Sequence, residues 1–202
     1  MEAKAAVFLD KDGTLIPDIP YNVNPDLVTL NPGVLEGLYE LQQHFSLFII
    51  SNQAGVAKGF FNIDELKRLM KHLLQLFRQH KVQISGYYFC PHDAHGLVEH
   101  YRLACNCRKP KPGLLLKAAA DHKLDLSKSW MIGDILNDVE AGKAAGCRSI
   151  LIANGNETEW ERAGEPLRTP DFIASDFLEA ATFIHQKTQE QNHVRKGYTQ
   201  KI

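Results

Sequence analysis

Residues 5–14 read AAVFLDKDGT, and this stretch decides the fold. The short apolar run Ala5–Leu9 predicts a buried strand. Asp10 and Asp12, followed by a glycine and Thr14, place two carboxylates and a hydroxyl where the chain leaves that strand. A single Asp-x-Asp at a strand end is common, so its meaning depends on the residues at the ends of the other strands.

Apolar runs alternate with amphipathic stretches along the whole chain. The predicted strands are Ala5–Leu9, Leu47–Ser51, Gly86–Cys90, Trp130–Gly133, Ser149–Ile152 and Asp171–Ala174. The predicted helices are Gly33–His44, Ile63–Lys81, Gly113–His122, Leu136–Ala145 and Phe177–Gln189, the second capped by Asn62 with Glu65. This α/β alternation predicts a parallel sheet with helices on both faces and ligands beyond the carboxyl ends of the strands.

Length and composition limit the classes of protein. With 202 residues, 44% hydrophobic and 23% charged, the chain suits a single domain over residues 1–190 and a polar tail over 191–202. A net charge of −1 argues against a nucleic-acid partner and an anionic membrane surface. No apolar run approaches the ~20 residues of a membrane span, and no signal peptide is recognisable, so we expect a cytoplasmic protein.

Polar residues come after the later strands too. Ser51 ends the second strand, Asp134 follows the fourth with Asp138 four residues on, and the basic run Arg108–Pro112 precedes the fourth strand. Carboxylates that converge repel one another, so a divalent cation is needed between them, and magnesium suits oxygen ligands together with a substrate phosphate. A carboxylate can attack phosphorus once the metal and a lysine neutralise the phosphoryl charge.

These four segments resemble the four motifs of the haloacid dehalogenase superfamily, from Ala5 to about Ile152. The resemblance implies a Rossmann-like fold and a phosphatase with Mg²⁺ as cofactor. Asp10 would be the nucleophile, and Asp12 the general acid and base. Ser51 and Lys109 would hold the phosphoryl oxygens.

The resemblance also implies the magnesium ligands. These would be the Asp10 carboxylate, the Asp12 main-chain carbonyl and Asp134. Thr14 would order the first loop, and Asp138 would support the site from behind. In the family the lysine stands before the first proline of Lys-Pro-x-Pro, which favours Lys109 over its neighbour Lys111.

Three cysteines and one histidine predict a second metal site within a loop over residues 90–107. The residues are Cys90, His92, Cys105 and Cys107. Three thiolates and an imidazole complete a tetrahedral set with no open position, which indicates a structural Zn²⁺. A Cys-x-Cys disulfide or buried free thiols are the alternatives. We expect Cys147 in the core, and His95 and His100 in solvent.

The zinc loop resembles that of the D-glycero-D-manno-heptose 1,7-bisphosphate 7-phosphatases and the related histidinol-phosphate phosphatases. The segments between the motifs are too short for a large cap, so the site should be open, and capless relatives are often monomers. The substrate, a small phosphorylated metabolite, would then be selected by loops. The resemblance implies substrate contacts from Asp18, Ile19, Pro20, Tyr21, Asn52, Gln53, Ala54 and Arg108.

One residue departs from the heptose pattern. Those enzymes usually carry a lysine directly after the fourth-motif aspartate, where this chain has Ile135. Histidinol phosphate or another small phosphate ester therefore stays open as the substrate. A phosphotransferase or mutase would need a cap to exclude water. A zinc-stabilised binding module with little catalysis is the alternative of another class, although no motif carboxylate is missing.

Overall fold

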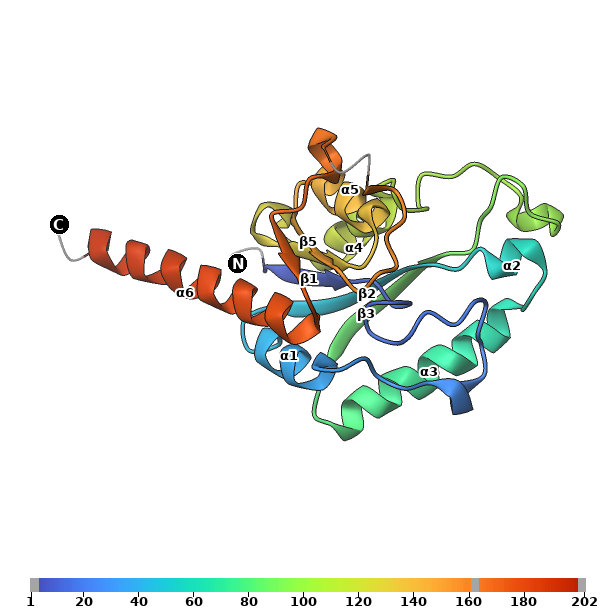
Figure 1. Cartoon of the computed structure of the whole chain (residues 1–202), viewed down its shortest axis with the longest axis horizontal. Helices are drawn as coiled ribbons and strands as arrows, with labels where there is room; N and C mark the ends of the chain where they lie inside the picture. Colours follow the sequence, from blue (N-terminus) through green and yellow to red (C-terminus); the bar gives the residue numbers. More distant parts are fainter. Residues whose placement is uncertain (1–3, 161–163, 200–202) are drawn as a thin grey trace.

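The computed structural model describes residues 4–160 and 164–199, with side chains through Glu190 (Figure 1). Its centre is a six-stranded parallel sheet in the order β3-β2-β1-β4-β5-β6. The strands are β1 (Ala6–Leu9), β2 (Ser46–Asn52), β3 (Ile84–Cys90), β4 (Trp130–Gly133), β5 (Arg148–Ile152) and β6 (Phe172–Ala174). All six agree with the predicted runs to within two residues, which confirms the α/β class.

The α-helices are α1 (Val34–Leu41), α2 (Gly55–Lys58), α3 (Ile63–Gln79), α4 (Gly113–His122), α5 (Leu136–Ala145) and α6 (Phe177–Thr199). Short 3₁₀ turns lie at η1 (Pro25–Leu27), η2 (Glu99–Tyr101), η3 (Leu126–Lys128) and η5 (Pro166–Arg168). The predicted capping box at α3 is present: Asn62 accepts from the backbone of Glu65, and the Glu65 carboxylate accepts from the Asn62 backbone N–H.

Two differences from the predicted helices have physical reasons. The four-residue α2 was not predicted, because so short a helix shows no periodicity. The last helix was expected to end at Gln189, but it continues to Thr199 and extends away from the body (Figure 1). The predicted end followed the loss of apolar periodicity in the sequence, but the hydrogen bonds of a helix lie within its own backbone, so the helix can continue beyond that point.

Alternate side chains of the central strands feed two cores. Val7 and Leu9 pack with α1, α3 and α6 on one face, whereas Phe8 packs with α4 and α5 on the other. Burying a large apolar side chain contributes about 1.5–3 kcal/mol, so this period-two pattern fixes which way each strand faces. Asp10 directly follows β1 and therefore lies at the carboxyl end of the sheet.

The strand order determines where the site lies. β1 is flanked by β2 and β4, and Leu9 aligns with Ile49 and Ile132. Chain connections leave in opposite directions from this point of the sheet, which opens a crevice at the carboxyl ends. Among the described residues no separate cap domain is inserted, and no described helix is long and apolar enough to cross a membrane.

Candidate active site and metal centres

The loop after β1 is held as a tight turn. The amides of Leu15 and Ile16 donate to the Lys11 carbonyl at 2.9 and 3.1 Å. Gly13 has a φ of 81° and faces the Asp134 carboxylate so closely that a Cβ would lie 1.9 Å from its Oδ2. Only glycine fits this turn without strain or collision, which explains why a glycine stands there.

Three buried carboxylates gather at the strand ends. One ligand oxygen each from Asp10, Asp134 and Asp138 lies within 4.8 Å of the others. Burial raises the pKa of Asp10 well above its usual value. Lys109 opposes this shift, and Asp138 and Asp134 add to it. Burial and Asp138 raise the pKa of Asp134 to about 6. An oxygen-rich, crowded set of this kind fits a divalent cation, which would keep the carboxylates ionised.

Lys109 lies between two of these acids. Its Nζ forms an ion pair with Asp10, lies 2.5 Å from Asp138 and donates to the Ile50 carbonyl at 3.1 Å, with a side chain only 3% exposed. Asn52 holds the Lys109 backbone by two hydrogen bonds of 3.0 Å. The structure thus brings the predicted lysine to the predicted nucleophile. It also brings Asp138 into direct contact with Lys109. Asp138 therefore lies within the cluster, whereas the sequence had indicated a position behind it.

Asp12 has partners of its own, separate from the Lys109 ion pairs. Its carboxylate contacts Lys11 Nζ at 2.9 Å and accepts from Gln53 Nε2 at 2.9 Å. Gln53 Nε2 also donates to the Ser51 hydroxyl at 2.7 Å, so the end of β2 is linked to the end of β1. The Asp12 side chain is 29% exposed, whereas that of Asp10 is 10% exposed.

Asp134 has two polar neighbours. Thr14 Oγ1 donates to its Oδ1 at 3.1 Å, and Asn156 Nδ2 donates to its Oδ2 at 2.6 Å. Asn154 Nδ2 donates to the Gly13 carbonyl at 2.8 Å. The sequence reasoning missed both asparagines, although they follow the strand predicted at Ser149–Ile152 and the strand-end rule could have found them.

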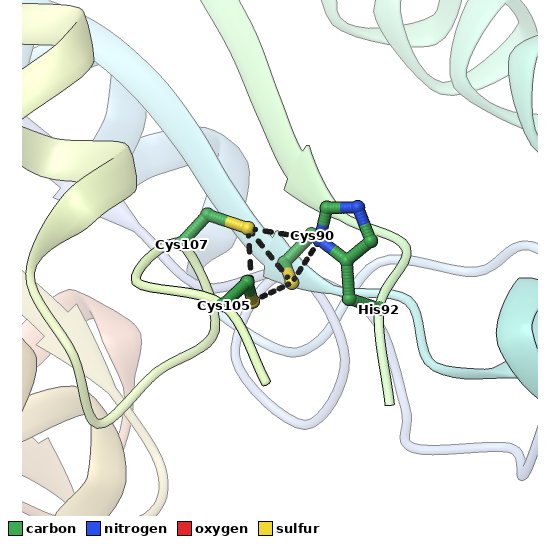
Figure 2. Close-up of side chains that lie close together, drawn as sticks. All are labelled: Cys90, His92, Cys105 and Cys107. Carbon is green, nitrogen blue, oxygen red and sulfur yellow. Dashed lines mark hydrogen bonds between the residues drawn. The ribbon is translucent and has the colours of Figure 1, made fainter. Parts of the chain in front are cut away.

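The predicted zinc ligands meet at the end of β3 (Figure 2). The three sulfur atoms lie 3.1–3.4 Å apart, and His92 Nδ1 is 3.2 Å from Cys107 Sγ and 3.6 Å from Cys90 Sγ. All four cysteines of the chain are free thiols in this structure, so the alternative of a disulfide between Cys105 and Cys107 is not formed. One tetrahedral zinc fits this donor set.

The residues expected to lie outside the zinc cluster do so. Cys147 is buried in the core, whereas His95 and His100 are exposed. Lys111 Nζ donates to the Cys105 carbonyl at 2.9 Å, away from the acidic cluster. The choice of Lys109 over Lys111 therefore agrees with the geometry.

A pocket of about 300 Å³ opens beside Asp12. All eight residues predicted to contact substrate line it. The complete lining is Lys11, Asp12, Asp18, Ile19, Pro20, Tyr21, Asn22, Asn52, Gln53, Ala54, Gly55, Lys58, Phe61 and Arg108. Sequence reasoning did not single out Lys11, which occupies the variable position between Asp10 and Asp12, or Lys58, which belongs to no recognised motif. Asp12 is among the lining residues, whereas Asp10, Asp134 and Asp138 are not.

A parallel sheet with this acidic cluster at its switch point defines the class of haloacid dehalogenase-like hydrolases. The HAD-hydrolase-like family model matches residues 106–180. D-glycero-beta-D-manno-heptose-1,7-bisphosphate 7-phosphatase of Escherichia coli K12 is 35% identical over 174 residues, 86% of this chain and 87% of the relative. Its namesake in Haemophilus influenzae is 36% identical over 161 residues, 79% of this chain and 87% of the relative.

A solved structure agrees with these relatives. D,D-heptose 1,7-bisphosphate phosphatase from B. bronchiseptica, complexed with magnesium and phosphate, aligns with a TM-score of 0.76 and 27% identity, over 91% of this chain and 99% of that chain. This chain belongs to the family of the D-glycero-D-manno-heptose 1,7-bisphosphate 7-phosphatases.

Proposed function

We propose that the protein is a magnesium-dependent phosphatase that removes the 7-phosphate of D-glycero-D-manno-heptose 1,7-bisphosphate through an aspartyl-phosphate on Asp10. The observation that carries the proposal is the meeting of Asp10, Lys109 and Asp134 at one point, with Asp12 among the residues that line the adjoining pocket. The names of the relatives, one of them seen with magnesium and phosphate, support the substrate and the cation.

The first step transfers the phosphoryl group to the protein. A carboxylate oxygen of Asp10 forms a bond to phosphorus while the bond from phosphorus to the sugar oxygen breaks, and Asp12 gives its proton to that oxygen. Lys109, already paired with Asp10, is placed to neutralise the phosphoryl oxygens, and Ser51 would donate a hydrogen bond to them.

The second step returns the protein to its starting state. Asp12 removes a proton from a water molecule, whose oxygen attacks phosphorus and releases the Asp10 carboxylate and inorganic phosphate. Mg²⁺, when held by Asp10, Asp134 and the Asp12 carbonyl, supplies charge neutralisation at the phosphoryl group. Thr14 and Asn156 orient Asp134 for this purpose.

Zinc has a structural role in this proposal. Arg108 and Lys109 directly follow Cys107, so zinc bound to the four ligands would fix the segment that delivers both cations to the site. The predicted cytoplasmic location, monomeric state and lack of nucleic-acid or membrane partners remain predictions. The net charge of −1 supports the absence of a polyanionic partner, and size-exclusion chromatography tests the monomer.

The test is phosphate release from both anomers of the heptose bisphosphate, from histidinol phosphate and from an aryl phosphate, with and without magnesium. We expect kcat/KM for one heptose anomer to exceed kcat/KM for the other esters by well over tenfold. A factor of ten corresponds to about 1.4 kcal/mol of transition-state discrimination. Asp10→Asn should be inactive. Asp26, an exposed aspartate in η1, provides the control: Asp26→Asn should retain turnover. A preference for histidinol phosphate would replace the substrate, and bound zinc without any hydrolysis would favour a binding module.

A further inference from the structure

The pocket beside Asp12 carries three cations of different standing. Lys11 is 1% exposed and is neutralised by Asp12 at 2.9 Å. Arg108 lines the pocket with a buried Nη1 that lacks a hydrogen-bond partner. Lys58, at the end of α2, is half-buried and forms no ion pair with any carboxylate within the part of the chain that the structure describes. Asp18 lines the same space, but among the described residues it forms no ion pair with Lys58 or Arg108, so both cations can still pair with an anion that enters the pocket.

Lys58 is nevertheless held in place. Its Nζ donates to the Tyr21 hydroxyl at 2.9 Å and lies 5.3 Å from the centre of the Tyr21 ring. An ammonium group has three N–H donors, and the phenol accepts only one of them. Lys58 thus keeps both its charge and free donors for a further acceptor.

Tyr21 is 46% exposed, and its side chain contacts Lys58 and Phe60. Its φ of 57° is unusual for a residue other than glycine, and its ring lies 4.4 Å from that of Phe60. A strained backbone persists only where the surrounding structure enforces it. The contact between Tyr21 and Lys58 therefore ties the loop that follows β1 to α2, across the pocket.

The position of the pocket decides which part of a substrate it would meet. Asp12 lines the pocket and Asp10 does not. A phosphoryl group on Asp10 would leave the rest of the substrate on the Asp12 side, where the leaving oxygen receives its proton. Lys58 and Arg108 would then face the leaving group and not the transferred phosphoryl group.

We propose that Lys58 is a specificity-determining residue that binds a second anionic group on the leaving-group portion of the substrate. This inference rests on the proposed function. Lys58 and Arg108 would together donate hydrogen bonds to the anion, and the Tyr21 hydroxyl would hold the Lys58 ammonium in position. Because Ile135 brings no charge to the site, the anion preference of this chain depends on these two pocket cations.

The experiment compares two esters with the same scissile bond. Steady-state kcat and KM are measured for heptose 1,7-bisphosphate and for heptose 7-phosphate, which lacks the second phosphate. The variants are Lys58→Gln, Lys58→Arg and Lys67→Gln, the last an exposed lysine on α3. A hydrogen bond to a charged group predicts that Lys58→Gln lowers kcat/KM for the bisphosphate about 10- to 100-fold, mainly through KM. It should change the monophosphate by no more than about twofold.

The controls separate binding from structure. Lys58→Arg should restore most of the bisphosphate activity, and Lys67→Gln should resemble the wild type on both esters. An equal loss on both esters would overturn the inference and leave Lys58 as a support for Tyr21. No loss on either would overturn it too. If the wild type hydrolyses neither heptose ester, the proposed substrate is wrong. The same ratio is then measured on a sugar bisphosphate and monophosphate pair that it does hydrolyse, and an unchanged ratio in Lys58→Gln refutes the inference.

Discussion

Replacing Lys109 with methionine tests how far the acidic cluster depends on one cation. The Lys109 side chain is 3% exposed, Asp10 is 10% exposed and Asp138 is fully buried. At such burial, solvent does not screen the charges, and removing one partner of a buried ion pair costs about 3–5 kcal/mol. Lys109→Met leaves three carboxylates facing one another, so the free energy of unfolding should fall by roughly this amount.

The measurement is urea unfolding in buffer without magnesium and without a chelator, so that the zinc site stays loaded. With an m-value of roughly 2–3 kcal/mol/M, the expected loss moves the midpoint down by roughly 1–2 M. Added magnesium should recover part of the lost stability, because the cation binds only the folded state and offsets the repulsion among the three carboxylates. The matched control is Lys117→Met, whose ion pair with Asp121 is 63% and 42% exposed. Exposed pairs of this kind contribute at most about 0.5 kcal/mol.

A loss of unfolding free energy in Lys109→Met no larger than the loss in Lys117→Met would contradict this prediction. A loss in Lys109→Met that added magnesium does not reduce would contradict it too. Either result would mean that the carboxylates are already neutralised by protonation in the folded protein.

Three further predictions concern the metals and the first turn. Magnesium should raise the melting temperature of the wild type and leave that of Asp134→Asn unchanged, which thermal unfolding with and without the ion measures. Metal analysis should find one zinc per chain in the wild type and in Cys147→Ser, and none in Cys105→Ser. The unfolding of Cys105→Ser should also be insensitive to chelators. Equal zinc in the two variants would contradict the assignment of Cys105 as a zinc ligand. Gly13→Ala should lose turnover at least about 100-fold, because its Cβ would meet the Asp134 carboxylate at 1.9 Å. Gly146→Ala has a similar positive φ of 93° in open space, and it should lose only about 1–2 kcal/mol of stability and keep its turnover.

The strands and the site motifs could be predicted because the physical signals are strong. A run such as Ala6–Leu9 is apolar at every position, as a strand covered on both faces must be, and a parallel sheet places its strand ends together. The zinc ligands were predictable from residue type alone, since few other arrangements use three cysteines and a histidine in a short loop.

The parts that could not be predicted depend on contacts that no local pattern encodes. Lys58 is a single lysine in a four-residue helix, and only the folded chain shows that it faces Tyr21 across a pocket. Asp138 was expected behind the site, because its spacing from Asp134 gives a shared helix side but not the direction of the side chain. Its contact with Lys109 brings together residues from distant loops.

The account rests on phosphoryl transfer to Asp10, which can be trapped directly. Substrate is mixed with the wild-type protein, in which Asp12 can still protonate the leaving oxygen, and during turnover the acyl-phosphate is reduced with borohydride to homoserine before digestion with trypsin. Cleavage after Lys4 and Lys11 gives the peptide 5–11, in which Asp10 is the only acidic side chain. Homoserine at residue 10, found by mass spectrometry only when substrate was added, is the predicted result. Unmodified Asp10 with a reduced residue elsewhere, or phosphate release without any trapped protein, would contradict it.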